Sequence, residues 1–261
     1  MLLNSPAAKD FSCPHTVELM TAGAPPPASV LQGIEKLGFN VTQVYGLTET
    51  YGHTVMCTWN SDWDNLDEEA SAKLKARQGA AMVQTAGMRI VDMESREDVP
   101  ADGQTIGEIL IRGNTVMKGY LKDADNTAES LKEGWFHTGD LAVMHAQGYA
   151  EIKDRLKDII ISGGENISSV EIEGVLHRHE AVSLAAVVAL PDDKWGEVPL
   201  AFLELIEGAQ VTEQEIEVFC RANLAGFKRP KKVIFGELPK TATGKIQKYE
   251  LRALARSGQL N

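Results

Sequence analysis

Residues 41–49 read VTQVYGLTE, an apolar extended run that leads into a glycine, a hydroxyl and a carboxylate. The start of this stretch predicts a strand, and so does the run Val17–Thr21. Apolar residues at helical spacing between residues 30 and 37 predict a helix that joins the two strands. Strand, helix and strand in this order form the unit of a parallel α/β sheet, whose ligands gather where the strands end. The turns at 23–25 and 46–49 are therefore predicted to line a binding site.

The middle of the chain is predicted to be mostly β, after an acidic, helix-compatible stretch at 62–76. Its strands are expected at 88–92, 107–112, 136–144 and 149–152. The last part has strands expected at 158–162, 184–189, 200–206 and 233–235, and helices that open at the capping boxes Ser168/Glu171 and Thr212/Glu215 and at residue 248. A β-α-β-β-α-β order is typical of a small α+β domain, so the sequence predicts α/β plus α+β organisation with a boundary near Lys157.

The composition fits a globular chain and excludes several broad classes. A length of 261 residues with 43% hydrophobic residues permits one large domain or two smaller ones. The net charge of -11 opposes general nucleic-acid binding, although a nucleotide can still be held locally. Cys13, Cys57 and Cys220 fit neither a disulfide framework nor paired zinc ligands, which favours a cytoplasmic location. The longest apolar run, 184–190, is far shorter than the roughly 20 residues that cross a bilayer, and we expect neither a membrane span nor a secretory leader.

A second signature near the end of the chain complements the first. Residues 239–245 read PKTATGK, a loop that presents one lysine beside a glycine. In the first signature, the ring of Tyr45 can stack on a purine, the hydroxyl of Thr48 can reach a phosphate, and the carboxylate of Glu49 can hold Mg²⁺. Each signature alone is typical of an ordinary turn. Both in one chain indicate chemistry on ATP.

Three further stretches lie in order with these signatures: Gly23-Ala24-Pro25, HTGD at 137–140 and DRLKD at 154–158. Nearly the whole chain resembles the carboxyl-terminal half of an ATP-dependent adenylate-forming enzyme, the superfamily of acyl-CoA synthetases, peptide-synthetase adenylation domains and firefly luciferase. The stretch YGLTETYGHT at 45–54 is most similar to ligases for short- or medium-chain acids. His53 in it either faces substrate or CoA, or belongs to a polar loop.

The resemblance implies two domains. Residues 1–156 are expected to be the carboxyl-terminal portion of the large AMP-binding domain, with an α/β part at about 1–78 and a β-rich part at about 79–156. Residues 157–261 are expected to form the small mobile α+β domain. The implied reaction joins a small carboxylic acid to CoA through an acyl-adenylate, with ATP and Mg²⁺.

The resemblance also implies roles for the residues around the nucleotide. The turn Gly23-Ala24-Pro25 would cover one face of adenine and Tyr45 the other, and Gly46 would let the backbone approach. Thr48 would contact phosphate and Glu49 would hold Mg²⁺.

Asp140 and Arg155 are implied to bind the ribose. A carboxylate suits a vicinal diol because hydrogen bonds to charged groups are strong. The alternatives are a turn carboxylate for Asp140 and a surface ion pair for Arg155.

Lys245 is implied to be the catalytic lysine, acting with Thr48 and Glu49. It would bridge the substrate carboxylate and the α-phosphate while pyrophosphate leaves. Because the carboxylate attacks phosphorus directly, catalysis needs charge stabilisation and alignment rather than a general base. The alternative is a solvated loop lysine beside Lys240 and Lys248.

A domain rotation about Lys157 is implied to build the site for thioester formation. The loop Ser162-Gly163-Gly164 would lie beside the pantetheine passage, or would be a mere strand-to-helix turn. Trp195, Phe227 and Arg229 are implied to contact CoA, with a core position as the alternative for Trp195.

One departure from the family pattern sets a further expectation. The Ser/Thr/Gly-rich phosphate loop that family members carry upstream is missing from the sequence, and G-x-x-x-x-G-K-[ST] is not matched either. The chain is therefore expected to be a fragment that adenylates poorly without the amino-terminal portion of the same enzyme. Homo-oligomerisation stays open. So do two other readings, an adenylating enzyme for a carrier protein and a non-catalytic nucleotide-binding or assembly module.

Overall fold

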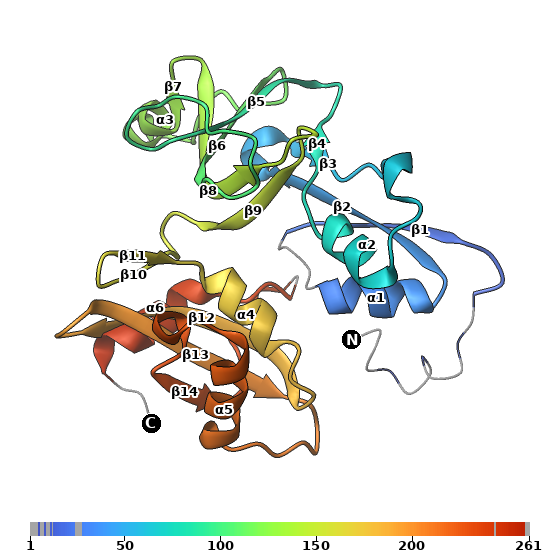
Figure 1. Ribbon diagram of the computed structural model, residues 1–261. Helices are drawn as coiled ribbons and strands as arrows, with labels where there is room; N and C mark the ends of the chain where they lie inside the picture. Colours follow the sequence, from blue (N-terminus) through green and yellow to red (C-terminus); the bar gives the residue numbers. More distant parts are fainter. Residues whose placement is uncertain are drawn as a thin grey trace. The chain divides into compact units, whose positions relative to one another are not determined.

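The computed structural model describes residues 5, 8, 11, 13–23, 28–242 and 244–258. The chain divides into two compact units, Met1–Ile152 and Lys153–Asn261, and Figure 1 shows the elements of each. Both α/β and α+β arrangements are present, which confirms the predicted fold class. Within the described residues, every helix is too short or too polar to cross a bilayer.

The first sheet of unit 1 has the strand order β1-β2-β3-β4. Its strands are β1 (Val17–Thr21), β2 (Phe39–Leu47), β3 (Gly52–Met56) and β4 (Ala80–Ala81). β1 pairs with β2 in parallel, and the helix α1 (Ala28–Lys36) connects them, so the predicted strand-helix-strand unit is confirmed. The helix α2 (Glu68–Lys75) packs on α1, where Lys75 pairs with Glu35.

The second sheet of unit 1 is antiparallel and has the order β5-β6-β8-β7, with β9 paired to β8. Its strands are β5 (Thr85–Val91), β6 (Gly107–Gly113), β7 (Leu131–Lys132), β8 (Trp135–Met144) and β9 (Ala150–Arg155). Buried Ile109 and Phe136 of this sheet share one core with Val55, and Tyr45 packs against that core. The core thus joins the two sheets and brings β2 next to β8.

Unit 2 is a sheet covered on both faces. Its strands are β10 (Ile160–Ser162), β11 (Glu165–Ile167), β12 (Val182–Asp192), β13 (Gly196–Leu205) and β14 (Lys232–Phe235). α4 (Ser169–Leu176) and α5 (Glu213–Asn223) pack on one face with Val187, while α6 (Lys248–Ser257) packs on the other with Ala186 and Val188. β12 is therefore apolar on both faces, which explains its continuous hydrophobic run.

Several short elements were not predicted: β3, β4, β7, β11 and the helix α3 (Ala124–Ser130). The expected loop at 162–166 is instead a hairpin, in which Ser162 pairs with Glu165. Thr212 and Glu215 form the predicted capping box, with both reciprocal bonds present. At the other predicted box, Ser168 accepts the amide hydrogen of Glu171, but the Glu171 carboxylate binds Lys228 instead of turning back. That box is therefore half formed.

Candidate functional site

Two predicted site residues from distant parts of the sequence meet in unit 1. The hydroxyl of Tyr45, on β2, donates a hydrogen bond of 2.7 Å to Oδ2 of Asp140, on β8. Asp140 is 5% exposed, so its carboxylate is largely shielded from water. The two side chains predicted to bind adenine and ribose therefore lie in direct contact.

A bulged turn inside β8, at residues 137–140, interrupts the ladder between β6 and β8. The register shifts between Glu108 and Leu110, opposite the turn, and Gly139 has a φ of +69°. Thr138 anchors the turn, because its hydroxyl donates to the carbonyl of Ile109 at 2.8 Å and accepts the amide hydrogen of Asp140 at 3.1 Å. Glycine suits the left-handed backbone at Gly139 because it has no Cβ.

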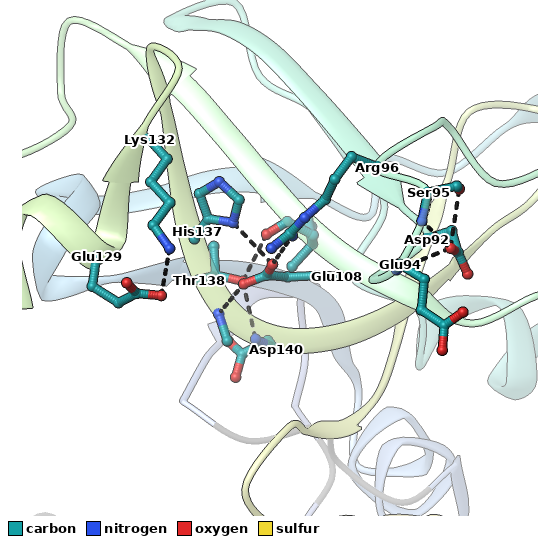
Figure 2. A network of polar contacts seen from close by, with 12 residues as sticks. Asp92, Glu94, Ser95, Arg96, Glu108, Glu129, Lys132, His137, Thr138 and Asp140 are labelled. Atoms are coloured by element: carbon teal, nitrogen blue, oxygen red, sulfur yellow. Dashed lines mark hydrogen bonds and ion pairs between the residues drawn. The ribbon is translucent and has the colours of Figure 1, made fainter.

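Glu108 is a buried carboxylate that the sequence reasoning missed. It is 7% exposed and lies at the centre of the network in Figure 2. Its Oε1 accepts the amide hydrogen of Gly139 at 3.1 Å, and its Oε2 lies 3.0 Å from Nδ1 of His137 and 3.3 Å from Nη1 of Arg96. A signal existed in the sequence, since Glu108 is a charged residue inside the otherwise apolar start of the strand predicted at 107–112.

The Thr48–Glu49 signature forms a single turn of 3₁₀-helix between β2 and β3, closed by Tyr51 with a φ of 56°. Oε1 of Glu49 accepts a hydrogen bond of 3.0 Å from the hydroxyl of Tyr120, a residue that the prediction omitted. Burial, together with the neighbouring Glu49, raises the pKa of Tyr120 above its ordinary value, so Tyr120 stays a hydrogen-bond donor.

Gly46 was predicted to lie in the turn 46–49, but it lies within a strand and has a structural role there. It lies inside β2, opposite His53 of β3, rather than in a loop after the strand. A Cβ at Gly46 would lie 1.9 Å from the carbonyl oxygen of Gly52. The glycine is therefore needed for the close approach of the two strands, and its contact with nucleotide stays a prediction.

Of the predicted adenine turn, Gly23 follows β1 with a φ of +93°, while Ala24 and Pro25 lie outside the described residues. Across the described part of the chain, His, Cys, Asp and Glu side chains form no group of three or more that could hold a metal. A single carboxylate such as that of Glu49 is still compatible with Mg²⁺, because that ion keeps several waters and is commonly held by one or two carboxylates plus substrate phosphates.

Two of the three cysteines, Cys57 and Cys220, are poor nucleophiles. The thiols of Cys57 and Cys220 are free and buried, and burial raises the pKa of each to about 11. Both are therefore protonated at neutral pH, and the thiolate is the reactive form.

Lys245 lies exposed on a tight loop of unit 2, before α6. The loop is closed by its own backbone: the amide of Thr241 donates to the carbonyl of Lys245 at 2.8 Å, and the amide of Lys245 donates to the Thr241 hydroxyl at 3.1 Å. Both flanking lysines form ion pairs, Lys240 with Glu204 at 2.7 Å and Lys248 with Glu173 at 2.6 Å.

The segment around the predicted hinge is held to unit 2 on both sides. The carboxylate of Asp154, 2% exposed, accepts the amide hydrogens of Arg155 and Ser169, and Asp158 pairs with Arg252 of α6. Lys157 is exposed in the turn between them. Arg155 ends β9, and its contact with ribose stays a prediction.

The predicted CoA residues are only partly brought together. The ring of Trp195 lies over Gly163, where a Cβ would be 2.9 Å from the ring, and the amide of Gly163 donates to the carbonyl of Trp195 at 2.8 Å. Trp195 is 43% exposed and so is not a core residue. Phe227 is 47% exposed, and the buried Nε of Arg229 has no hydrogen-bond partner within the described structure.

Comparison with protein families gives two matches in this chain. The family described as AMP-binding enzyme matches residues 1–121, and the AMP-binding enzyme C-terminal domain matches residues 171–245.

Individual relatives agree with these matches. The acetate–CoA ligase CCL3 of Humulus lupulus is 53% identical over 93% of this chain and 44% of its own length. The o-succinylbenzoate CoA synthetase MenE of Bacillus subtilis, solved with the acyl-adenylate OSB-AMP, has a TM-score of 0.79 at 32% identity over 96% of this chain and 49% of its own. The amide bond synthetase McbA of Marinactinospora thermotolerans has a TM-score of 0.81 at 29% identity over 96% of this chain and 50% of its own. The chain thus spans about half the length of the relatives it matches.

Proposed function

The chain belongs to the family of AMP-binding, adenylate-forming enzymes, and from that premise we propose that it serves an acyl-CoA synthetase. In the first step, an oxygen of a carboxylate attacks the α-phosphorus of ATP, which forms acyl-AMP and releases pyrophosphate. In the second step, the thiol of CoA attacks the acyl carbon, which forms the thioester and releases AMP and a proton.

The contact between Tyr45 and Asp140 is the observation that carries this proposal. It places an aromatic ring beside a shielded carboxylate, the two groups that an adenosine needs for stacking and for its sugar hydroxyls. Thr48 and Glu49 follow Tyr45 on the same hairpin, where a phosphate and its Mg²⁺ would lie. Gly23, Ala24 and Pro25 would cover the other face of adenine.

Lys245 would act by charge. Its ammonium would stabilise the negative charge that develops as the carboxylate attacks and pyrophosphate leaves, so no proton has to move. The exposed position of Lys245 on its loop supports this role. Two further residues complete this proposal. Arg155 would bind the ribose, and Lys157 would be the pivot of the domain rotation.

CoA would bind along unit 2. Trp195 and Phe227 offer half-exposed rings, and Arg229 offers a guanidinium to a phosphate. The pantetheine arm of CoA would run beside the hairpin turn Ser162-Gly163-Gly164. It would pass Gly164 rather than Gly163, because the Trp195 ring fills the space over Gly163.

The acid is proposed to be small, since the relative CCL3 is an acetate–CoA ligase. The acceptor has a competing candidate, because McbA is an amide bond synthetase of the same fold. A carrier protein is a further alternative acceptor. Replacing Trp195 tests CoA against the other two acceptors.

Calorimetric titration of the chain with AMP tests the nucleotide site directly. Asp140→Ala should weaken AMP binding at least about tenfold, because each hydrogen bond to a charged group contributes about 1.5–3 kcal/mol. Asp98→Asn is the control, since Asp98 pairs with Arg89 on the same sheet and is well exposed. Equal AMP affinity in Asp140→Ala and the unchanged chain would overturn the proposal.

A further inference from the structure

The turn that carries Asp140 rests on a carboxylate that the proposed reaction does not use. Glu108 is buried, and within the described structure its side chain contacts this turn, at Gly139 and His137, and one cation, Arg96. Figure 2 shows Glu108 between Arg96 and the turn. Taking a carboxylate out of water is costly unless it is paired and hydrogen-bonded, so this arrangement is an organised one.

We propose that Glu108 is a positioning residue for ribose recognition. It holds the turn 137–140 so that the Asp140 carboxylate presents its oxygens to the sugar hydroxyls, and Arg96 balances the charge of Glu108. This inference rests on the proposed role of Asp140.

The need for such an anchor follows from the backbone. The ladder between β6 and β8 skips residues 138–140, and Gly139 is in the left-handed region, so pairing with β6 does not fix these three residues. Among the described hydrogen bonds to the turn amides at 139 and 140, one acceptor is a charged carboxylate, Glu108, and the other is the neutral hydroxyl of Thr138. A charge-assisted bond is roughly twice as strong as a neutral one, so Glu108 is the stronger of the two anchors.

Glu108→Gln tests the anchor with little change of shape. If the amide oxygen keeps the Gly139 bond, the amide nitrogen faces Arg96 and cannot accept from it. If the amide is flipped, the Gly139 bond is lost. Either orientation removes one contact. Asp98→Asn is the matched control, because it neutralises an exposed carboxylate in the same unit that makes no contact with the turn in the described network.

The first measurement compares binding of AMP and of 2′,3′-dideoxy-AMP. The unchanged chain should prefer AMP at least about tenfold, because only AMP offers the hydroxyls to Asp140. Glu108→Gln should lower this preference to about threefold or less while binding of the dideoxy nucleotide stays nearly the same. Asp98→Asn should keep the full preference. A preference that survives in Glu108→Gln would overturn the positioning role.

The second measurement needs no nucleotide. Amide hydrogen exchange at residues 138–140 should be at least about tenfold faster in Glu108→Gln and unchanged in Asp98→Asn. If the unchanged chain does not distinguish the two nucleotides, the proposed function of Asp140 fails, and exchange alone then decides whether Glu108 holds the turn. Unchanged exchange would overturn the anchor.

Should Glu108→Gln not fold, the half-exposed Arg96→Met replaces it, with exchange at Gly139 expected at least about threefold faster. Unchanged exchange in that variant would again overturn the inference.

Discussion

The proposed nucleotide site of unit 1 and the lysine loop of unit 2 are built in opposite ways. Asp140 is shielded and held by a buried network that includes Tyr45, Thr138 and Glu108. Lys245 is exposed on a loop that is closed by its own backbone, with the packed helix α6 behind it. The difference indicates that the carboxylate proposed to bind the sugar is preorganised, whereas the proposed catalytic cation lies on an exposed loop.

The largest effect is expected from removing the Lys245 ammonium. In an enzyme completed with the amino-terminal portion of a relative, Lys245→Ala should lower acyl-AMP formation by about 10²–10³-fold, because a preorganised charge is lost from the transition state. Thioester formation from supplied acyl-AMP should change far less. Pyrophosphate exchange and thioester release measure the two steps separately. An equal loss in both would contradict a cation that serves adenylation alone.

The next effect concerns the stability of unit 2 around α6, the helix that follows the lysine loop. Lys248 binds Glu173 at 2.6 Å and the hydroxyl of Ser169 at 2.7 Å, and the carboxylate of Glu173 also accepts the amide hydrogen of Val187. Lys248→Met should lower the free energy of unfolding by about 2–3 kcal/mol, because it leaves a largely buried carboxylate without its cation. Urea unfolding of both proteins measures this difference.

The same substitution has a pH signature. Burial raises the pKa of Glu173 above its ordinary value, although Lys248 opposes the shift, and removing Lys248 should raise that pKa further. A raised folded-state pKa means that the folded protein binds more protons, so stability rises as the pH falls through that pKa toward the unfolded value. The cost of Lys248→Met should therefore be larger at about pH 8 than at about pH 5. A cost independent of pH would show that Glu173 is not the affected group, and Glu173→Gln in the Lys248→Met background should recover stability.

The smallest effect is expected on the use of CoA as the acceptor. Trp195→Ala should raise the KM for CoA about five- to tenfold, because it removes a half-exposed ring from the proposed path, and should leave pyrophosphate exchange nearly intact. Phe235→Ala, at another partly exposed ring of unit 2, is the control. Unchanged saturation by CoA in Trp195→Ala would favour an amine or a carrier protein as the acceptor.

Sequence patterns predicted the long elements well because their periodicity is set by burial. α5 and the apolar β12 are examples, each with one or two faces that pack on a core. The short strands β4 and β7 were missed, since two residues carry no period. The hairpin of β10 and β11 was missed because glycines in its turn are equally typical of a loop.

For the site, motifs predicted Tyr45 and Asp140, and the structure brings them together. Glu108 and Tyr120 were missed, because each acts through a contact with a residue far away in the sequence. Gly46 was assigned to a loop, since nothing in the sequence shows how closely the next strand approaches. Long-range contacts are thus the part that local patterns do not contain.

The half-formed cap of α4 links that helix to a distant segment. Glu171 gives its carboxylate to Lys228 at 2.7 Å instead of to its own helix end, and Lys228 adjoins both Phe227 and Arg229. Losing the Lys228 ammonium would release Glu171 to complete the reciprocal cap. The first turn of α4 would then gain a hydrogen bond, while the segment 226–229 would lose its ion pair to that helix. Order at the start of α4 and order in this surface segment are therefore expected to change in opposite directions.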